Sequence, residues 1–406
     1  MSTRDLSSRP VDPAALAVVG SGLVALAVAM GIGRFAFTPL MPLMMRDGTL
    51  SADAGAEWAA ANYVGYLVGA LTAARFAGNP RRGLLLSLLG VALATLATAA
   101  ADRAAAHVTG AGLRAATGVF SAWALVCASS WCLAELARRR APQLGAWIYA
   151  GVGLGIALAG TLAWLGGRQP ADWLWLELGL LAAAGALLAW SLPRGPDAAS
   201  DKQVAREAAA TAHGGRSGQL GLVLCYGTFG FGYIVPATFL PAMARALAPD
   251  PLVFGLAWPL FGLAAAVSVA AVALWLPHVP RRRLWAAAQG IMALGTALPL
   301  VVQALWAVAV SAICVGGTFM IATMAGLQLA REARPDNPTP LLARMTTAFA
   351  AGQIVGPLLV RGIGPGRWAG WDALSWAGAL ATLLLLLTAL WLWRGARPDP
   401  TSVRPA

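Results

Sequence analysis

Two arginines stand in long apolar stretches of the sequence, where a charge is costly. Arg34 is the only acid or base between residues 14 and 45, and Arg114 lies within the apolar stretch 107–133. Placing an arginine at the centre of a membrane helix costs about 2.5–3.5 kcal/mol on insertion scales, so such residues usually serve a polar interior or a ligand. Both guanidinium groups are candidates to bind an anionic group or to shift the pKa of a neighbouring acid. The alternative is a structural role, in which each arginine bonds the carbonyls of a broken helix or extends toward the membrane surface.

The residues around Arg34 predict a helix that is thin and easily bent. Gly31 and Gly33 remove side chains beside it, so another helix or a ligand can come close. Pro39 and Pro42 each remove a backbone donor and favour a kink, which membrane helices tolerate where neighbours bond the freed carbonyls. We expect this stretch to gate a pathway. Similar roles in packing or bending are expected of residues on other segments: Gly118, Gly356 and Pro357.

Other polar side chains in the apolar stretches are candidates to line a substrate cavity. Thr38 follows Arg34 by one turn of helix. Arg114 is followed on the same helical face by Thr117, Gly118 and Ser121. The remaining candidates form two clusters, which are Asn62, Tyr63 and Tyr66 on one stretch and Thr346, Thr347 and Gln353 on another. The alternative for each is a hydrogen bond that holds neighbouring helices together.

The composition indicates a membrane protein with many spans. Hydrophobic residues make up 59% of the 406 residues and charged residues only 11%, against roughly 25% charged in soluble domains. The net charge of +12 comes from basic residues in short loops, which indicates membrane orientation rather than nucleic-acid binding. The four cysteines form no CxxC pair and the three histidines lie at segment ends or in loops, so we expect neither a metal site nor a cofactor.

Charges, prolines and polar runs divide the chain into twelve apolar segments, each long enough for a helix to cross a bilayer. The predicted spans are 14–45, 57–76, 83–101, 107–133, 144–166, 173–192, 218–244, 251–276, 284–301, 304–329, 343–361 and 371–393. The longest polar stretch separates the sixth and seventh segments. The expected organisation is therefore a bundle of six helices over 1–192, a linker over 193–217 and a second bundle over 218–406.

The distribution of basic residues predicts the orientation. With both termini in the cytoplasm, the inside segments carry 21 of the 29 basic residues and the outside loops carry 6, and Arg34 and Arg114 are the other two. The uncleaved first helix follows a short basic N-terminus. We therefore expect both termini to be cytoplasmic.

The two halves of the chain repeat several features in the same order. The Gly31-x-Gly33 pair recurs as Gly230-x-Gly232, which places Tyr233 opposite Arg34. A Leu-Ala-Arg sequence follows the fourth segment and also the tenth. Together these features predict a duplicated unit of six helices, as in one architecture of secondary transporters.

This pattern resembles the major facilitator superfamily (MFS) over essentially the whole chain. The run from Gly31 to Pro39, Gly-Ile-Gly-Arg-Phe-Ala-Phe-Thr-Pro, is similar to its YbfB-like branch of bacterial transporters, as is the run from Ala61 to Ala70. The resemblance implies two bundles that rock about a central cavity, usually driven by a proton gradient, with the first, fourth, seventh and tenth spans lining the cavity. Arg114-Ala-Ala-Thr-Gly118 resembles a fourth-helix motif linked to proton coupling in antiporters. The acid usual in the second-to-third loop is absent, and so is the fifth-helix Gly-Pro.

The acids favour one class of solute. All 17 lie in loops or near segment ends, so no carboxylate is placed mid-membrane to bind a cation. Together with the family resemblance, which implies proton coupling, this leads us to expect an all-α, twelve-helix transporter of a small anionic or zwitterionic organic solute, monomeric, in a bacterial inner membrane. The main alternative is a proton-driven exporter of lipophilic compounds, because aromatic side chains alone can hold cations. A membrane enzyme would need a His/Asp/Glu constellation at one membrane face, and a sensor would need a sizeable soluble module; neither is evident.

Overall fold

The structure is a computed structural model that describes residues 12–100, 106–191, 216–247, 257–364 and 366–395. The described chain is helical apart from turns and one isolated bridge between Trp368 and Trp371. The all-α class predicted from the apolar segments is therefore confirmed for the described residues.

The first half of the chain forms these elements: α1 (Pro13–Leu26), the π-helical segment η1 (Ala27–Phe35), α2 (Phe37–Arg46), α3 (Ala52–Thr72), the 3₁₀ helix η2 (Ala73–Phe76), α4 (Pro80–Ala99), α5 (Ala106–Arg138), the 3₁₀ helix η3 (Pro142–Ala146), α6 (Trp147–Leu165) and α7 (Ala171–Ser191). The second half forms α9 (Arg216–Leu247), α11 (Ala257–Trp275), α12 (Arg281–Val301), α13 (Leu305–Ala333), α14 (Thr339–Ile363) and α15 (Ala373–Arg394).

Because α1, η1 and α2 form one almost continuous run, the described ranges contain twelve long helical segments, which coincide with the twelve predicted ones. The largest differences are at the start of α3, which begins at Ala52 before the predicted start at Glu57, and at the end of α5, which continues to Arg138 beyond the predicted end at Leu133. The predicted linker 193–217 lies outside the described residues except for the last two, which begin α9. The division into two domains therefore stays a prediction.

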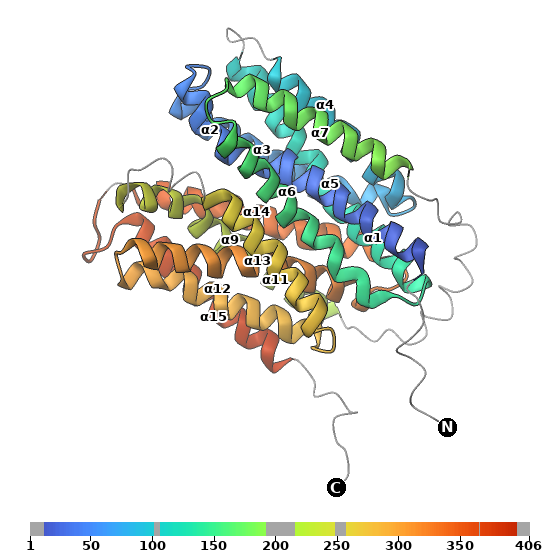
Figure 1. Ribbon diagram of the computed structural model, residues 1–406. Helices are drawn as coiled ribbons and strands as arrows, with labels where there is room; N and C mark the ends of the chain where they lie inside the picture. Colours follow the sequence, from blue (N-terminus) through green and yellow to red (C-terminus); the bar gives the residue numbers. More distant parts are fainter. Residues whose placement is uncertain (1–11, 101–105, 192–215, 248–256, 365, 396–406) are drawn as a thin grey trace.

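The same helix pairings occur in each half of the chain. In the first half α1 packs on α6, α3 on α5, and α4 on both α5 and α7. The second half repeats these pairings with α9 on α14, α11 on α13, and α12 on both α13 and α15. Contacts between the halves run mainly through α3 with α14 and α6 with α11. Figure 1 shows the first-half helices, blue to green, lying together above the second-half helices, yellow to red.

Ten helical stretches in the described ranges are long and apolar enough to cross a membrane. They do not include α3 and α14, which carry the polar clusters at Asn62 and Gln353. These two helices pack against one another between the halves. A helix that faces protein on several sides meets less lipid and can hold more polar side chains.

The predicted packing glycines lie where two backbones or large side chains come close. A Cβ atom on Gly31 would overlap the backbone of Gly155 on α6, and one on Gly118 would overlap the α3 backbone at Asn62. Gly33 faces the side chain of Val91, and Gly356 faces Ile234. Small residues thus let the helices approach closely, as membrane helix packing requires.

The close approach at Gly31 leads to a stability prediction. Gly31→Ala is expected to destabilise the fold by about 1–3 kcal/mol, because the added methyl group meets backbone atoms that cannot rotate away. The matched control is Gly20→Ala on α1, where a Cβ atom meets nothing within 4 Å. Thermal unfolding in detergent measures both variants. Equal unfolding temperatures would show that η1 and α6 are not in contact at this position.

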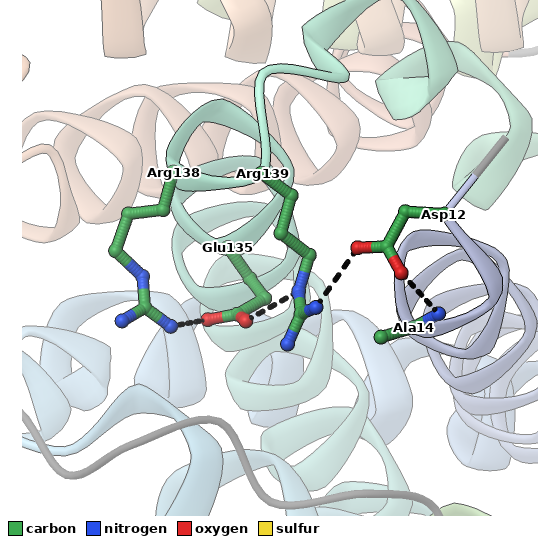
Figure 2. A network of polar contacts seen from close by, with 5 residues as sticks. All are labelled: Asp12, Ala14, Glu135, Arg138 and Arg139. Atoms are coloured by element: carbon green, nitrogen blue, oxygen red, sulfur yellow. Dashed lines mark hydrogen bonds and ion pairs between the residues drawn. The ribbon is translucent and has the colours of Figure 1, made fainter. Parts of the chain in front are cut away.

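A polar network ties the end of α5 to the start of α1 (Figure 2). Glu135 accepts hydrogen bonds from Arg138 and, at 2.8 Å, from Nε of Arg139. Arg139 also bonds Asp12 at 3.0 Å, and Asp12 caps α1 by accepting the backbone N–H of Ala14 at 2.9 Å. The Ala14 N–H and then the Arg139 guanidinium hold the pKa of Asp12 below its usual range. The cap therefore stays charged at neutral pH, which favours the helix N-terminus.

Candidate functional site

A small cavity lies between the helices of the two halves, with room for about one water molecule. The residues that line it are Met30, Arg34, Phe35, Tyr66, Leu125, Tyr226, Tyr233, Phe319, Met320, Thr323 and Phe349. They come from η1, α3, α5, α9, α13 and α14. The first, fourth, seventh and tenth helical segments, which the family resemblance implies for the cavity, all contribute, together with α3 and α14.

Arg34 is the charged residue of this cavity. It lies in η1 and is only 3% exposed. One of its N–H groups donates from Nη2 to Oε1 of Gln353 on α14, so the bond joins the two halves of the chain. Its guanidinium carbon lies 3.8 Å from the ring centroid of Tyr66 and 5.6 Å from that of Tyr63. Such cation–π contacts with two rings partly compensate the loss of water around the charge.

Several hydrogen-bond donors near Arg34 have no partner among the described residues. They are Nε and Nη1 of Arg34, Nε2 of Gln353 and the hydroxyl of Tyr66, and all four atoms are buried. The lining residues include no acid, and the described ion pairs do not involve Arg34. A buried charge without a counter-charge is unfavourable, and an anionic group that accepted from these donors would reduce this cost.

Arg114 has a different environment from Arg34, although it is equally buried at 3% exposure. Its Nη1 donates to the carbonyl of Gly33 at 2.8 Å, and its Nη2 donates to the carbonyl of Arg34 at 3.0 Å. Both carbonyls belong to η1, where the π-helical geometry alters the usual backbone hydrogen bonds. Both terminal nitrogens are thus bonded to the backbone that carries Arg34, while the buried Nε of Arg114 has no partner among the described residues. Of the two roles considered from the sequence, this geometry is that of an arginine bonded to the carbonyls of a broken helix.

Three more polar side chains hold this part of the bundle. Asn62 donates from Nδ2 to the carbonyl of Arg114 at 3.0 Å and to the hydroxyl of Thr117 at 3.2 Å. Ser121 on α5 donates to the carbonyl of Ala29, in η1, at 2.6 Å. Asn62, Thr117 and Ser121 therefore connect helices, and they do not line the cavity.

The other predicted residues are placed as follows. Tyr233 lines the cavity and is 1% exposed, and Tyr63 lies beside Arg34. Thr38, by contrast, has an exposed side chain and is not among the lining residues. Pro42 and Pro357 lie inside helices, and Pro39 lies in the first turn of α2, next to η1.

The sequence reasoning missed most of the aromatic lining. Phe319 on α13 stacks on Tyr233, with ring centroids 5.0 Å apart and planes at 21°, and its ring also meets the edge of Phe35 at 6.2 Å. Phe349 on α14 stacks on Tyr233 at 6.3 Å. One available signal was the spacing of Tyr226, Phe229 and Tyr233, which places three aromatic rings on one face of α9.

Comparison with known proteins identifies related sequences and folds. The model of a family described as "Uncharacterised MFS-type transporter YbfB" matches residues 26–392. No curated protein matches this sequence. The crystal structure of the human organic anion transporter MFSD10 (TETRAN) is similar in fold, with a TM-score of 0.68 and 18% identity, covering 95% of this chain and 100% of that chain.

Two further structures have similar folds. The MFS proton:xylose symporter XylE has a TM-score of 0.72 and 13% identity, covering 94% of this chain and 95% of that chain. A D-xylose-proton symporter has a TM-score of 0.64 and 15% identity, covering 94% and 96%. At these identities the likeness shows the fold alone.

Proposed function

This chain belongs to the YbfB family of MFS-type transporters, and from that premise we propose that it moves a small organic anion or zwitterion by alternating access. The membership confirms the family predicted from the sequence motifs. It also makes the chain a multi-pass membrane protein of a transporter family, which argues against an enzyme.

The observation that carries the solute class is the environment of Arg34. A buried guanidinium with two unpaired nitrogens and no acid among the lining residues keeps a positive potential inside the bundle. A carboxylate or similar group would accept charge-assisted hydrogen bonds from these nitrogens. One of the proteins with a similar fold is an organic anion transporter, which is consistent with this proposal. Because that similarity is one of fold only, the proposed anion preference depends on Arg34.

The transport cycle and its setting are part of the same proposal. We propose two six-helix bundles that rock about the cavity, supported by the helix pairings that recur in the two halves. Both termini face the cytoplasm of a bacterial inner membrane, as the distribution of basic residues suggests. The protein works as a monomer and couples transport to a proton gradient, and uptake into proteoliposomes under an imposed pH gradient tests the coupling.

A second candidate is export of lipophilic compounds against protons. It is favoured by the aromatic lining, since six of the eleven residues around the cavity are phenylalanine or tyrosine. Arg34 opposes this candidate for cationic compounds, because like charges in a site of low polarity repel strongly.

A thermal-shift screen separates the two candidates. The detergent-purified protein is heated with anionic, zwitterionic, neutral and cationic metabolites, and Arg34→Gln is measured alongside. We expect stabilisation by acids that is lost in the variant. Stabilisation by lipophilic cations, unchanged in the variant, would instead support the exporter.

A further inference from the structure

We propose that the solute is a monoanion whose single carboxylate is attached to a flat aromatic ring. This inference rests on the proposed function and names the solute class within it. It follows from the number of available positive charges, the position of the free donors and the arrangement of the rings around them.

The charge of the solute follows from the different states of the two buried arginines. Arg114 donates both of its terminal nitrogens to the carbonyls of Gly33 and Arg34. Arg34 donates only Nη2 to Gln353, so Nε and Nη1 remain available. Of the residues that line the cavity, Arg34 is the charged one. Arg114 keeps its positive charge and a buried Nε without a partner among the described residues, but it does not line the cavity, so a second carboxylate there would have no arginine to pair with directly.

The free donors suit the shape of a carboxylate. Arg34 supplies Nε and Nη1, the amide of Gln353 supplies Nε2 beside it, and Tyr66 supplies a hydroxyl from under the guanidinium. These donors come from η1, α14 and α3, so they surround the guanidinium from both halves of the chain. A carboxylate has about four acceptor positions; because the Nε–H and Nη1–H bonds of one guanidinium diverge, its oxygens can accept from one of these two groups together with Gln353 or Tyr66.

The rings next to this charge suit an aromatic solute. Phe35 follows Arg34 directly in η1, and its ring meets Phe319 of the other half at 6.2 Å. Phe319 is stacked in turn on Tyr233 and on Phe261, at 5.0 and 5.4 Å. In the proposed rocking motion the halves would separate, and the ring of Phe319 would lose its contact with Phe35. A flat ring carried by the carboxylate can take that place, since aromatic pairs favour edge-to-face and offset-stacked arrangements.

Calorimetric titration of the full-length protein in detergent tests this inference. The ligands are benzoate, cyclohexanecarboxylate, acetate, phthalate and the neutral benzamide. We expect benzoate to bind roughly 3–10 times more tightly than cyclohexanecarboxylate, and at least about 100 times more tightly than acetate, because acetate buries no ring. Phthalate and benzamide are expected to bind at least about 100 times more weakly than benzoate.

A variant adds a second test. In Phe319→Leu the preference for benzoate over cyclohexanecarboxylate is expected to disappear. The matched control is Phe120→Leu, because Phe120 contacts Trp123 and does not line the cavity. The control is expected to keep the full preference.

The outcomes distinguish this inference from the proposed function. If phthalate binds more tightly than benzoate, or if acetate and benzoate bind equally well, the solute is not an aromatic monoanion. The proposal of anion transport is unaffected by either result. Binding of acetate or cyclohexanecarboxylate without binding of benzoate would likewise contradict the inference and leave the proposed function unaffected. If none of the acids binds and a lipophilic cation does, both the inference and the proposed function fail.

Discussion

Replacing Arg34 by glutamine is expected to weaken binding of the anionic solute by at least about 100-fold. The variant removes the charge of a cavity-lining residue and its two buried nitrogens that have no partner among the described residues. Hydrogen bonds to charged groups contribute about 1.5–3 kcal/mol each, and two of them amount to at least about two factors of ten in affinity. Titration calorimetry with the acid found in the thermal-shift screen gives the ratio of dissociation constants.

Two controls make the Arg34 result specific. Arg34→Lys keeps the charge but replaces the planar group by a point charge, so we expect it to recover part of the affinity. Arg34→Gln should unfold at the same or a higher temperature than the natural protein, because it removes a buried charge that has no counter-charge. Unchanged affinity in Arg34→Gln would contradict the assigned role, and a collapse of stability would indicate a structural one.

Arg114→Gln is expected to have the second largest effect, and its primary effect is to lower the stability of the fold. The carbonyls of Gly33 and Arg34 lose their donors in an apolar interior. Each carbonyl left unpaired costs about 1–3 kcal/mol, so the variant should unfold at a clearly lower temperature. Anion binding should weaken as well, because the π-helical backbone that positions the Arg34 side chain loses its support. Thermal unfolding and calorimetry on the same preparation measure both effects.

The control for Arg114 is an arginine with an exposed side chain. Arg75→Gln removes a guanidinium that lies over Trp123 at 4.9 Å and is expected to change stability little. A stable Arg114→Gln with normal anion binding but no response to a pH gradient would contradict the positioning role. That result would support the proton-coupling role which the fourth-helix motif implies.

Arg34 could be chosen as a candidate site residue from the sequence alone, because it is the lone charge in an apolar segment. The helical segments could be predicted for a related reason, since a bilayer requires helices of a minimum apolar length. The different roles of Arg34 and Arg114 could not be predicted. They depend on hydrogen bonds between residues that are about 80 or more than 300 positions apart in the chain.

Thr38 shows why spacing along the sequence was not enough to predict which residues line the cavity. A residue four positions after Arg34 lies on the same face only in an α-helix, and η1 is π-helical through Phe35. The longer turn changes the face on which later residues lie, and Thr38 is exposed. No sequence rule used for Arg34 indicates such a change of helix type.

The aromatic lining was hidden for a different reason. Phe319 and Phe349 are apolar residues in apolar segments, so they do not contrast with their neighbours as Arg34 does. Their position beside the charge depends on side-chain contacts that join α13 and α14 to η1. Only the assembled bundle brings these rings and the guanidinium to one cavity.

Counterflow exchange in proteoliposomes tests most directly whether Arg34 binds a transported anion. Vesicles containing the natural protein or Arg34→Gln are loaded with the unlabelled acid, and entry of the labelled acid is followed. The account predicts rapid exchange that saturates with concentration in the natural protein and no exchange above empty vesicles in Arg34→Gln. A full exchange rate in the variant, or exchange of lipophilic cations without any exchange of acids in the natural protein, would contradict it.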